Sequence, residues 1–351
     1  MSKILVAMSG GVDSSVAAAL LKDSGYDVIG ITLKLFENDN NYSNNQKACC
    51  NYKSVKDARM VAENLQIPHY VIDASDIFNK FVIENFFLEY QKGRTPNPCI
   101  RCNQFIKFDF LFKKAKELKC EMIATGHYAK IKNGYLYRGA DLEKDQSYFL
   151  YVIYGSKIKN IVFPLQDLTK KIVRKIASEK KLITAQKTES QDICFVQDNN
   201  YRELIASKMN FDEGDIVDTS GRLIGKHKGI FRFTIGQRKG LGALGEKKFV
   251  KEIIPDKNII VVGTEEELYS KRAKIIDIFK PENFLFEYSK EYNVMIRYRS
   301  KPVKCKIISE ENNNLTIEFC EPVKSVTPGQ SAVLYDNDMV VCGGIIDKAI
   351  K

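Results

Sequence analysis

The sequence contains three histidines and no long apolar run. Structural zinc sites usually need a second Cys-x-x-Cys or a pair of histidines beside the first Cys-x-x-Cys. Here the one such pair, Cys99 and Cys102, is followed by neither, which disfavours structural zinc. No apolar run approaches membrane-spanning length, and the N-terminus lacks a basic region followed by an uninterrupted apolar one. These absences predict a cytoplasmic protein with no membrane partner.

The composition is that of a soluble globular protein, with 44% hydrophobic and 28% charged residues. A length of 351 residues predicts two or three domains. Nine cysteines, an odd number, argue for reactive or metal-binding thiols rather than a disulfide framework. The net charge of +10 is compatible with a polyanionic partner, but lysine-rich proteomes give the same value without one.

A strand, a glycine turn and a helix follow one another within the first 25 residues. The apolar run Ile4–Met8 leads into the segment SGGVDSS at 9–15, and an alanine- and leucine-rich stretch then ends at Gly25. Glycines let backbone N–H groups approach a pyrophosphate, serines offer hydroxyl donors, and a helix N-terminus favours an anion. Neither the Walker pattern nor the dinucleotide fingerprint fits. An ordinary strand-to-helix turn is the alternative, but the segment resembles the SGGxDS loop of the ATP pyrophosphatases, and it would hold phosphate without a lysine.

Strands and helices alternate through the first half of the chain. Strands are predicted at 28–35, 69–73 and 121–125, with helices opening at Ser54 and spanning 75–92. This alternation predicts an α/β domain with a doubly wound parallel sheet. Asn133-Gly134 predicts a β-hairpin, and 145–184 is predicted to be helical, most firmly over 165–180.

Beyond about residue 205, short β segments replace helices. Strands are predicted at 214–217, 231–234 and 258–262, and then at 294–299, 303–308, 315–319, 331–335 and 340–346. The later group suggests a compact barrel. We therefore expect an N-terminal domain over residues 1–205, a small β-rich central domain over 206–271, and a C-terminal β-barrel over 272–351.

The segment RTPNPCIRCN, residues 94–103, presents two thiols. Two prolines constrain the backbone just before Cys99 and Cys102, and Arg101 lies between them. Positive charge and a helix predicted to begin at about Asn103 would both raise the thiolate fraction, which makes Cys102 a candidate nucleophile. Cys194, beside apolar residues, would by itself be interpreted as a small core residue.

Seven ordered motifs resemble those of the tRNA-specific 2-thiouridylases and cover nearly the whole chain. They are SGGVDSS at 9–15, GRTPNPC and CN within 93–103, ATGHY at 124–128, KDQSYFLY at 144–151, ICF at 193–195, TIGQRKGLG at 234–242 and VTPGQSAV at 326–333. The resemblance implies a domain of the PP-loop, or HUP-like, type. It implies an ATP-dependent sulfurtransferase that adenylates C2 of the wobble uridine in the tRNA anticodon stem-loop. Sulfur from a cysteine persulfide then replaces the oxygen and gives 2-thiouridine.

The resemblance also implies roles for individual residues. It places ATP at Ala7, Met8, Ser9, Gly10, Gly11, Val12, Asp13, Ser14, Leu33 and Gly126. It makes Cys102 the nucleophile and Cys194 the persulfide carrier, and the two form a disulfide when sulfur is delivered. It places tRNA contacts at Asn97, Pro98, Cys99, His127, Lys144, Asp145, Gln146, Arg297, Tyr298 and Gln330.

One position departs from the family pattern. The family often has aspartate where this chain has Cys99, and a thiol does not replace a carboxylate whose ordinary pKa is near ~4. Cys99, Cys102 and Cys194 could instead be three ligands of an iron–sulfur cluster, so both mechanisms stay open. We favour the persulfide, because the nucleophile position is kept and the cytosol reduces the resulting disulfide. Mg²⁺ is expected to neutralise the pyrophosphate, with Asp13 near the metal.

Two basic clusters are compatible with an RNA partner, although solvated charged faces look the same. Arg297, Arg299 and Lys301 would alternate on one strand face, and the segment 226–239 carries further lysines and arginines without an acid. A monomer that also meets a sulfur-donor protein is expected. Two other functions remain: another ATP pyrophosphatase, such as an amidotransferase-type ligase or lysidine synthetase, and a non-catalytic iron–sulfur or RNA-binding protein.

Overall fold

The computed structural model describes residues 2–36, 52–155, 158–188, 193–196, 200–209, 211–241 and 247–351. The chain forms two compact units. The first comprises residues 1–83, 98–199 and 338–340, and the second comprises 84–97, 200–337 and 341–351. Within the described ranges, no helix is both long enough and apolar enough to cross a membrane.

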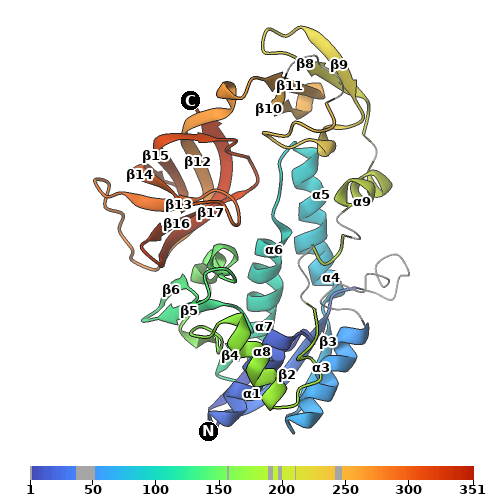
Figure 1. The fold of residues 1–351 in the computed structure, drawn as a ribbon, viewed down its shortest axis with the longest axis vertical. Helices are drawn as coiled ribbons and strands as arrows, with labels where there is room; N and C mark the ends of the chain where they lie inside the picture. Colours follow the sequence, from blue (N-terminus) through green and yellow to red (C-terminus); the bar gives the residue numbers. More distant parts are fainter. Residues whose placement is uncertain are drawn as a thin grey trace. The chain divides into compact units, whose positions relative to one another are not determined.

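A five-stranded parallel sheet forms the centre of the first unit (Figure 1). Its strands are β1 (Lys3–Ala7), β2 (Asp27–Lys34), β3 (His69–Asp73), β4 (Met122–Ala124) and β7 (Ile161–Val162), in the order β3-β2-β1-β4-β7. β1 is central, so its apolar run is buried between two neighbours. The strand order reverses direction at β1, which makes the carboxyl end of β1 a switch point where α/β sheets commonly bind ligands.

Helices cover both faces of this sheet. Ile4 and Val6 of β1 share one core with α1 (Val12–Asp23), α3 (Tyr52–Asn64) and α8 (Lys170–Glu179). Leu5 points to the opposite face, because side chains alternate along a strand, and it is also fully buried. Helix α7 (Leu111–Glu117) also packs on β1 and β4. The predicted doubly wound α/β domain is therefore confirmed.

Two long helical runs carry aromatic residues and the Cys-x-x-Cys pair. The first comprises α4 (Ser75–Phe78), a π-helical turn η1 (Asn79–Ile83) and α5 (Glu84–Gln91), close to the prediction of 75–92. The second begins with α6 (Pro98–Arg101), continues as a π-helix η2 (Cys102–Phe110) and ends with α7. It begins at Pro98 rather than at about Asn103, because proline suits the first helical position. Cys102 therefore lies one turn inside the run and opens its π-helical part, a conformation common at functional sites.

The hairpin prediction is confirmed, and the helical prediction for 145–184 is partly wrong. Strands β5 (Ala129–Lys132) and β6 (Tyr135–Arg138) are joined by Asn133 and Gly134, whose φ values of 54° and 78° are those a tight two-residue turn requires. Short 3₁₀ turns η3 (Ser147–Phe149), η4 (Tyr151–Gly155) and η5 (Ile158–Asn160) precede β7. The helix α8 begins only after Thr169, whose hydroxyl accepts a hydrogen bond from the Ile172 N–H and caps it.

The central part of the chain, within the second unit, is a small β domain preceded by α9 (Tyr201–Lys208). Its four strands, β8 (Gly214–Val217), β9 (Leu223–His227), β10 (Phe249–Ile254) and β11 (Ile259–Gly263), lie in the order β10-β11-β8-β9. The strand predicted at 231–234 is wrong. Gly229, with a φ of 98°, turns the chain into the 3₁₀ turn η7 (Ile230–Arg232), and Ile230 and Phe233 enter the core of this domain. Short 3₁₀ turns η8 (Pro255–Lys257) and η9 (Glu266–Leu268) flank β11.

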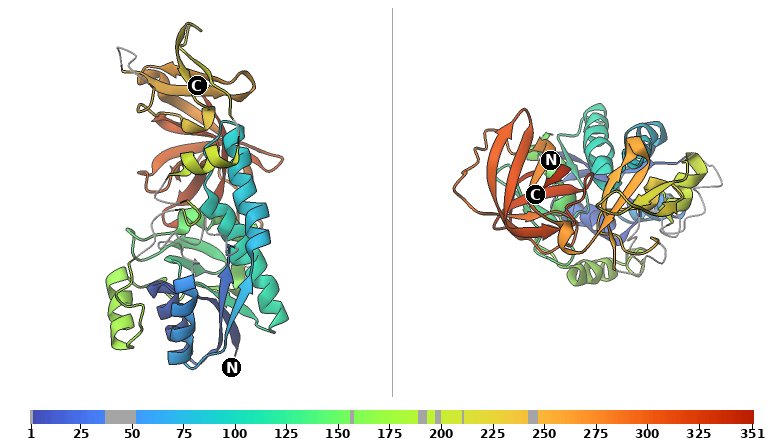
Figure 2. Two further views of the ribbon diagram at one scale, coloured as in Figure 1. Left: turned by 90° about the vertical axis from the view of Figure 1, so that its right-hand side faces the viewer. Right: turned by 90° about the horizontal axis from the view of Figure 1, so that it is seen from above.

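A closed barrel follows (Figure 2). Its strands are β12 (Tyr269–Phe279), β13 (Tyr292–Met295), β14 (Val303–Glu311), β15 (Asn314–Lys324), β16 (Ser331–Asp336) and β17 (Met339–Ile350), and pairing of β12 with β17 closes it. The barrel prediction is confirmed. The strand predicted at 294–299 is wrong beyond Met295, because Ser300 N–H bonds to Arg297 O in a turn in which Arg299 has a φ of 60°. Arg297, Arg299 and Lys301 therefore do not alternate along a strand face.

Candidate active site

The loop 9–15 leaves the carboxyl end of β1 and enters α1. Gly10 has a φ of 68°, and a Cβ there would lie 2.1 Å from the backbone oxygen of Ser54. The backbone of α3 thus approaches the loop so closely that only glycine fits. Gly11 is the N-cap of α1 and offers no side-chain oxygen to the first-turn N–H groups. This geometry is compatible with an anion at the start of α1, and phosphate binding by the loop stays a prediction.

The loop serines bind the loop itself. The Ser14 and Ser15 hydroxyls donate to Gly11 O at 3.1 and 2.8 Å, and the Ser9 N–H donates to Ser14 Oγ at 3.1 Å. Ser14 and Ser15 are buried, whereas Ser9 is exposed. In this structure Ser14 and Ser15 hold the backbone of the loop 9–15, which we call the anion cradle. A direct contact of Ser14 with ATP stays a prediction.

Two lysines distant in sequence lie at the loop, although the sequence suggested that no lysine would serve it. Lys170 Nζ lies 2.8 Å from each carboxylate oxygen of Asp13, and the Tyr128 hydroxyl donates to Asp13 Oδ1 at 2.7 Å. Lys187 Nζ donates to Gly10 O at 2.9 Å. Neither lysine belongs to a recognisable pattern. Only the packing of α8 and of the segment after it brings them to the loop.

Leu33 and Gly126 lie at the same end of the sheet as the loop. Leu33 is almost at the end of β2, and Gly126 follows β4. A Cβ on Gly126 would lie 2.7 Å from the Asp13 carbonyl carbon and the Ser14 nitrogen, so Gly126 packs directly on the start of α1. The structure thus brings Gly126 against the loop. Its contact with a nucleotide stays a prediction.

The thiols of interest differ in exposure. Cys99 is exposed, and Cys102 and Cys194 are half-buried. Phe195, next to Cys194, packs edge-on against Phe78 of α4 with ring centroids 5.9 Å apart. The helix η2, which begins at Cys102, also packs on α4. Because α4 begins directly after β3, η2 and the Cys194–Phe195 segment both pack on a helix at the carboxyl edge of the sheet.

Cys99, Cys102 and Cys194 do not gather into a metal-ligand group. Among the residues that the structure describes, no three His, Cys, Asp or Glu side chains are grouped so that they could hold a metal ion. Asp13, expected near Mg²⁺, is bound instead by the Lys170 ammonium. Within the described ranges, the three cysteines therefore do not form a ligand group for a cluster, and the Asp13 carboxylate is engaged in an ion pair.

His127 is buried in the first unit, although a tRNA contact was expected there. Its Nδ1 lies 2.7 Å from Thr125 Oγ1, and its Nε2 lies 3.3 Å from Lys107 Nζ. Burial, and then the Lys107 charge, hold the pKa of His127 well below its usual value. The ring is therefore neutral at physiological pH, with Nε2 accepting from Lys107 and Nδ1 donating to the threonine. The tRNA contact stays a prediction.

Asp145 and Gln146 support the Tyr128 side of the loop. Asp145 accepts from the Gly139 and Ser147 N–H groups and from the Ser147 hydroxyl, and burial raises its pKa despite these hydrogen bonds. Gln146 Oε1 accepts from the Tyr128 N–H at 3.0 Å. Since Tyr128 binds Asp13, these residues indirectly position α1. The tRNA contacts expected at Lys144, Asp145 and Gln146 stay predictions.

In the second unit, the segment 94–97 is tied to the barrel. Gln330 Nε2 donates to Thr95 O at 2.8 Å, and Thr95 N–H donates to Pro328 O at 2.9 Å. Arg94 binds Glu89, with Nε 2.8 Å from the carboxylate, and its guanidinium reaches Ile346 O. Gln330 thus holds the backbone that leads to Asn97 and the thiols. Its expected tRNA contact, and those of Asn97 and Pro98, stay predictions.

Arg297 is held by the same barrel segment. Its Nη2 donates to Ser325 O at 2.9 Å and to Thr327 Oγ1 at 2.6 Å. Arg299 is exposed, with its guanidinium 5.2 Å from the ring centre of Tyr298. Arg297 therefore contributes to the packing of the VTPGQ segment. The expected tRNA contacts of Arg297 and Tyr298 stay predictions.

We predict that Arg297→Glu lowers the free energy of unfolding by about 1.5–3 kcal/mol, because it removes charge-assisted hydrogen bonds. Arg299→Glu is the control and should stay within about 0.5 kcal/mol of the parent protein. Urea unfolding measures both. Equal midpoints for the two variants would show that the Arg297 contacts do not stabilise the barrel.

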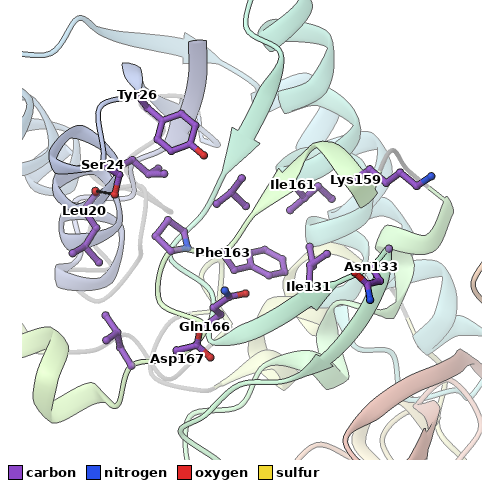
Figure 3. Close-up of a pocket in the computed structure, with 15 residues that line it drawn as sticks. Leu20, Ser24, Tyr26, Ile131, Asn133, Lys159, Ile161, Phe163, Gln166 and Asp167 are labelled. Atoms are coloured by element: carbon purple, nitrogen blue, oxygen red, sulfur yellow. Dashed lines mark hydrogen bonds between the residues drawn. The ribbon is translucent and has the colours of Figure 1, made fainter. Parts of the chain in front are cut away.

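One cavity of about 650 Å³ lies on the first unit, away from this loop (Figure 3). Its walls come from the C-terminal half of α1, the β5–β6 hairpin and the segment around β7. Leu20, Tyr26, Ile131, Phe163 and Gln166 are among them. Its described lining residues include no cysteine and no residue of the loop 9–15. The cavity is therefore not where the thiols or the anion cradle meet a substrate.

Three family models match consecutive parts of the chain. A tRNA methyl transferase HUP domain matches residues 2–198, a tRNA methyl transferase PRC-barrel domain matches 202–264, and an aminomethyltransferase beta-barrel domain matches 266–346. A solved 4-thiouridine synthetase in complex with RNA and ATP is 13% identical, covering 59% of this chain and 50% of that one, with a TM-score of 0.36. That likeness is too slight to support an inference.

Curated relatives match over nearly the full length. The chain is 46% identical to the tRNA-specific 2-thiouridylase MnmA of Caldicellulosiruptor saccharolyticus, covering 99% of each chain. It is 44% identical to the enzyme of the same name from Dehalococcoides mccartyi, covering 98% of this chain and 96% of that one. With such identity along the whole chain, and with the anion loop, Cys102 and Cys194 in one α/β unit, this chain belongs to the tRNA-specific 2-thiouridylase family.

Proposed function

We propose that this protein uses ATP to adenylate the C2 oxygen of the wobble uridine in tRNA and then replaces that oxygen with sulfur. The loop 9–15 binds the phosphates of ATP, with the nucleotide also reaching Leu33 and Gly126. Cys194 carries the sulfur as a persulfide, and Cys102 is the thiol that completes the transfer. The product is 2-thiouridine in the anticodon stem-loop.

One arrangement carries this proposal. The Cys194 segment and the helix that begins at Cys102 both pack on α4, at the sheet edge from which the loop 9–15 emerges. Lys187, which precedes Cys194 in the sequence, contacts the loop at Gly10 O. An anion cradle beside two half-buried thiols suits a reaction in which adenylation is followed by sulfur transfer. A ligase of the same loop type would not need the paired thiols.

Every bond that forms in the proposed sulfur transfer is matched by a bond that breaks. ATP converts the uridine C2 oxygen into an adenylate and releases pyrophosphate. The terminal sulfur of the Cys194 persulfide attacks C2, and AMP leaves. The Cys102 thiolate then attacks Cys194 Sγ, the S–S bond to the tRNA sulfur breaks, and 2-thiouridine leaves with a Cys102–Cys194 disulfide formed. A cytosolic thiol reductant returns both cysteines to thiols.

Cys99 distinguishes the two sulfur routes. If sulfur travels as a persulfide, Cys99→Ser should keep the thiolation rate within about tenfold of the parent, because Cys99 does not carry the sulfur that is transferred. If three thiolates hold a cluster, the same variant should lose iron and activity together. The measurements are iron content and 2-thiouridine formation with anaerobically purified protein. An iron-replete parent with an iron-free, inactive variant would contradict the persulfide route.

In this proposal, the domain at 1–205 binds ATP and is catalytic, 206–271 is a small β-rich central domain, and the barrel at 272–351 contacts tRNA. The residues proposed to contact the RNA are Asn97, Pro98, Cys99, His127, Lys144, Asp145, Gln146, Arg297, Tyr298 and Gln330. A sulfur-donor protein loads Cys194. We place the enzyme in the cytoplasm, because its tRNA substrate and the thiol reductants are found there. We expect it to act as a monomer.

A reconstitution tests the function. Purified protein, unmodified tRNA, ATP and a persulfide-loading desulfurase should give 2-thiouridine, measured by mass spectrometry of tRNA digests. Pyrophosphate release should depend on tRNA. ATP consumption without sulfur incorporation would favour a ligase, and no tRNA-dependent ATP consumption would contradict the proposal.

A further inference from the structure

Lys187 makes three contacts at the back of the loop 9–15. Its ammonium donates to Gly10 O at 2.9 Å, lies 2.5 Å from an Asp57 carboxylate oxygen, and lies 3.4 Å from Ser54 Oγ. Its side chain is 28% exposed and that of Asp57 is 17% exposed. Asp57 and Ser54 belong to α3, so the ammonium joins the loop to that helix.

The Gly10 carbonyl determines where the next N–H points. In a trans peptide, the C=O of one residue and the N–H of the next are directed to opposite sides. With Gly10 O held by Lys187 toward α3, the Gly11 N–H is directed away from α3. Gly11 is the N-cap of α1, so this N–H is directed to the side where an anion meets the start of the helix.

The peptide between Gly10 and Gly11 is not fixed by its own residues. Gly10 has a φ of 68°, and as a glycine it has access to several other backbone conformations. The loop serines fix Gly11 O, not Gly10 O. Among the hydrogen bonds found within the described residues, the one to Gly10 O comes from Lys187.

We propose that Lys187 is a positioning residue: by holding Gly10 O, it keeps the Gly11 N–H directed at the phosphates of ATP. The inference deepens the proposed function and rests on it, because it needs ATP to bind this loop. Lys187 touches the back of the cradle and not the substrate.

The first test compares lysine variants by calorimetric titration with ATP and with inorganic pyrophosphate, without tRNA. Lys187→Met should weaken both ligands at least tenfold, and Lys187→Arg should recover most of the affinity, because guanidinium also donates to a carbonyl. Lys180→Met is a matched control, since Lys180 is 30% exposed and lies 2.5 Å from Asp23. It should bind both ligands as the parent does. Parental affinity in Lys187→Met would overturn the inference.

Asp57→Asn separates positioning from simple tethering. It removes the ion pair but leaves the ammonium able to donate to Gly10 O, so it should lower ATP affinity less than Lys187→Met does. Equal losses in the two variants would overturn the inference in favour of the ion pair. A parent protein that binds neither ATP nor pyrophosphate would instead contradict the proposed function.

A measurement on the parent protein does not depend on any variant folding. In protein labelled with ¹⁵N-glycine, pyrophosphate should shift the Gly11 amide resonance, while Gly25, at the far end of α1, should not move. An unmoved Gly11 resonance at saturating pyrophosphate would overturn the inference.

Discussion

In a single turnover without added thiol reductant, replacement of Cys102 by alanine should lower the release of 2-thiouridine tRNA by more than about 10³-fold, because removal of a nucleophile abolishes the step that it performs. Cys102 is half-buried at the start of η2, so the small side chain should be tolerated by the fold. Without Cys102, sulfur attack on C2 still displaces AMP, but the S–S bond between Cys194 and the tRNA is not broken. A tRNA–protein adduct that a thiol reductant releases should therefore accumulate, and denaturing gels would detect it.

Cys194→Ala is the matched comparison. It should also lose thiolation, but it should form no adduct, because the sulfur has no carrier. Binding of ATP should be unchanged in both variants. Full thiolation in either variant would contradict the assigned roles, and an adduct in Cys194→Ala would place the persulfide on another cysteine.

Replacement of Gly10 by alanine should reduce ATP affinity by more than about tenfold, which corresponds to about 1.4 kcal/mol. The new Cβ would lie 2.1 Å from Ser54 O, so either α3 or the loop must move. The φ of 68° adds strain of about 1 kcal/mol for any residue with a Cβ. Calorimetric titration with ATP measures the affinity.

Gly25→Ala separates strain from collision. Gly25 has a φ of 82°, but a Cβ there would meet no atom within 4 Å. This variant should lose about 1 kcal/mol of stability and keep its ATP affinity. Equal ATP affinities in the two variants would show that the close approach of Ser54 does not shape the phosphate cradle.

Local patterns in the sequence determined the fold class. The apolar run before Gly10, the alternation of strands with helices, and the Asn133-Gly134 turn are short-range features, and each led to the element that the structure contains. Predictions failed where a neighbour decided the conformation. Residues 231–234 look like a strand, but Gly229 leads into a 3₁₀ turn that ends at Arg232, and Phe233 packs into the core of the small domain. The strand expected to continue through Arg297 ends at Met295 because a turn begins there.

For the site, the sequence by itself predicted a phosphate-binding loop and a nucleophile at Cys102, and its resemblance to a family predicted the role of Cys194. It could not determine what supports them, because those contacts join positions far apart in the chain. Lys170 reaches Asp13, and Gln330 reaches Thr95. No periodicity encodes such pairs, since each depends on how separate elements pack. Only the tertiary structure places Lys170 and Lys187 against the loop 9–15, which contains no lysine.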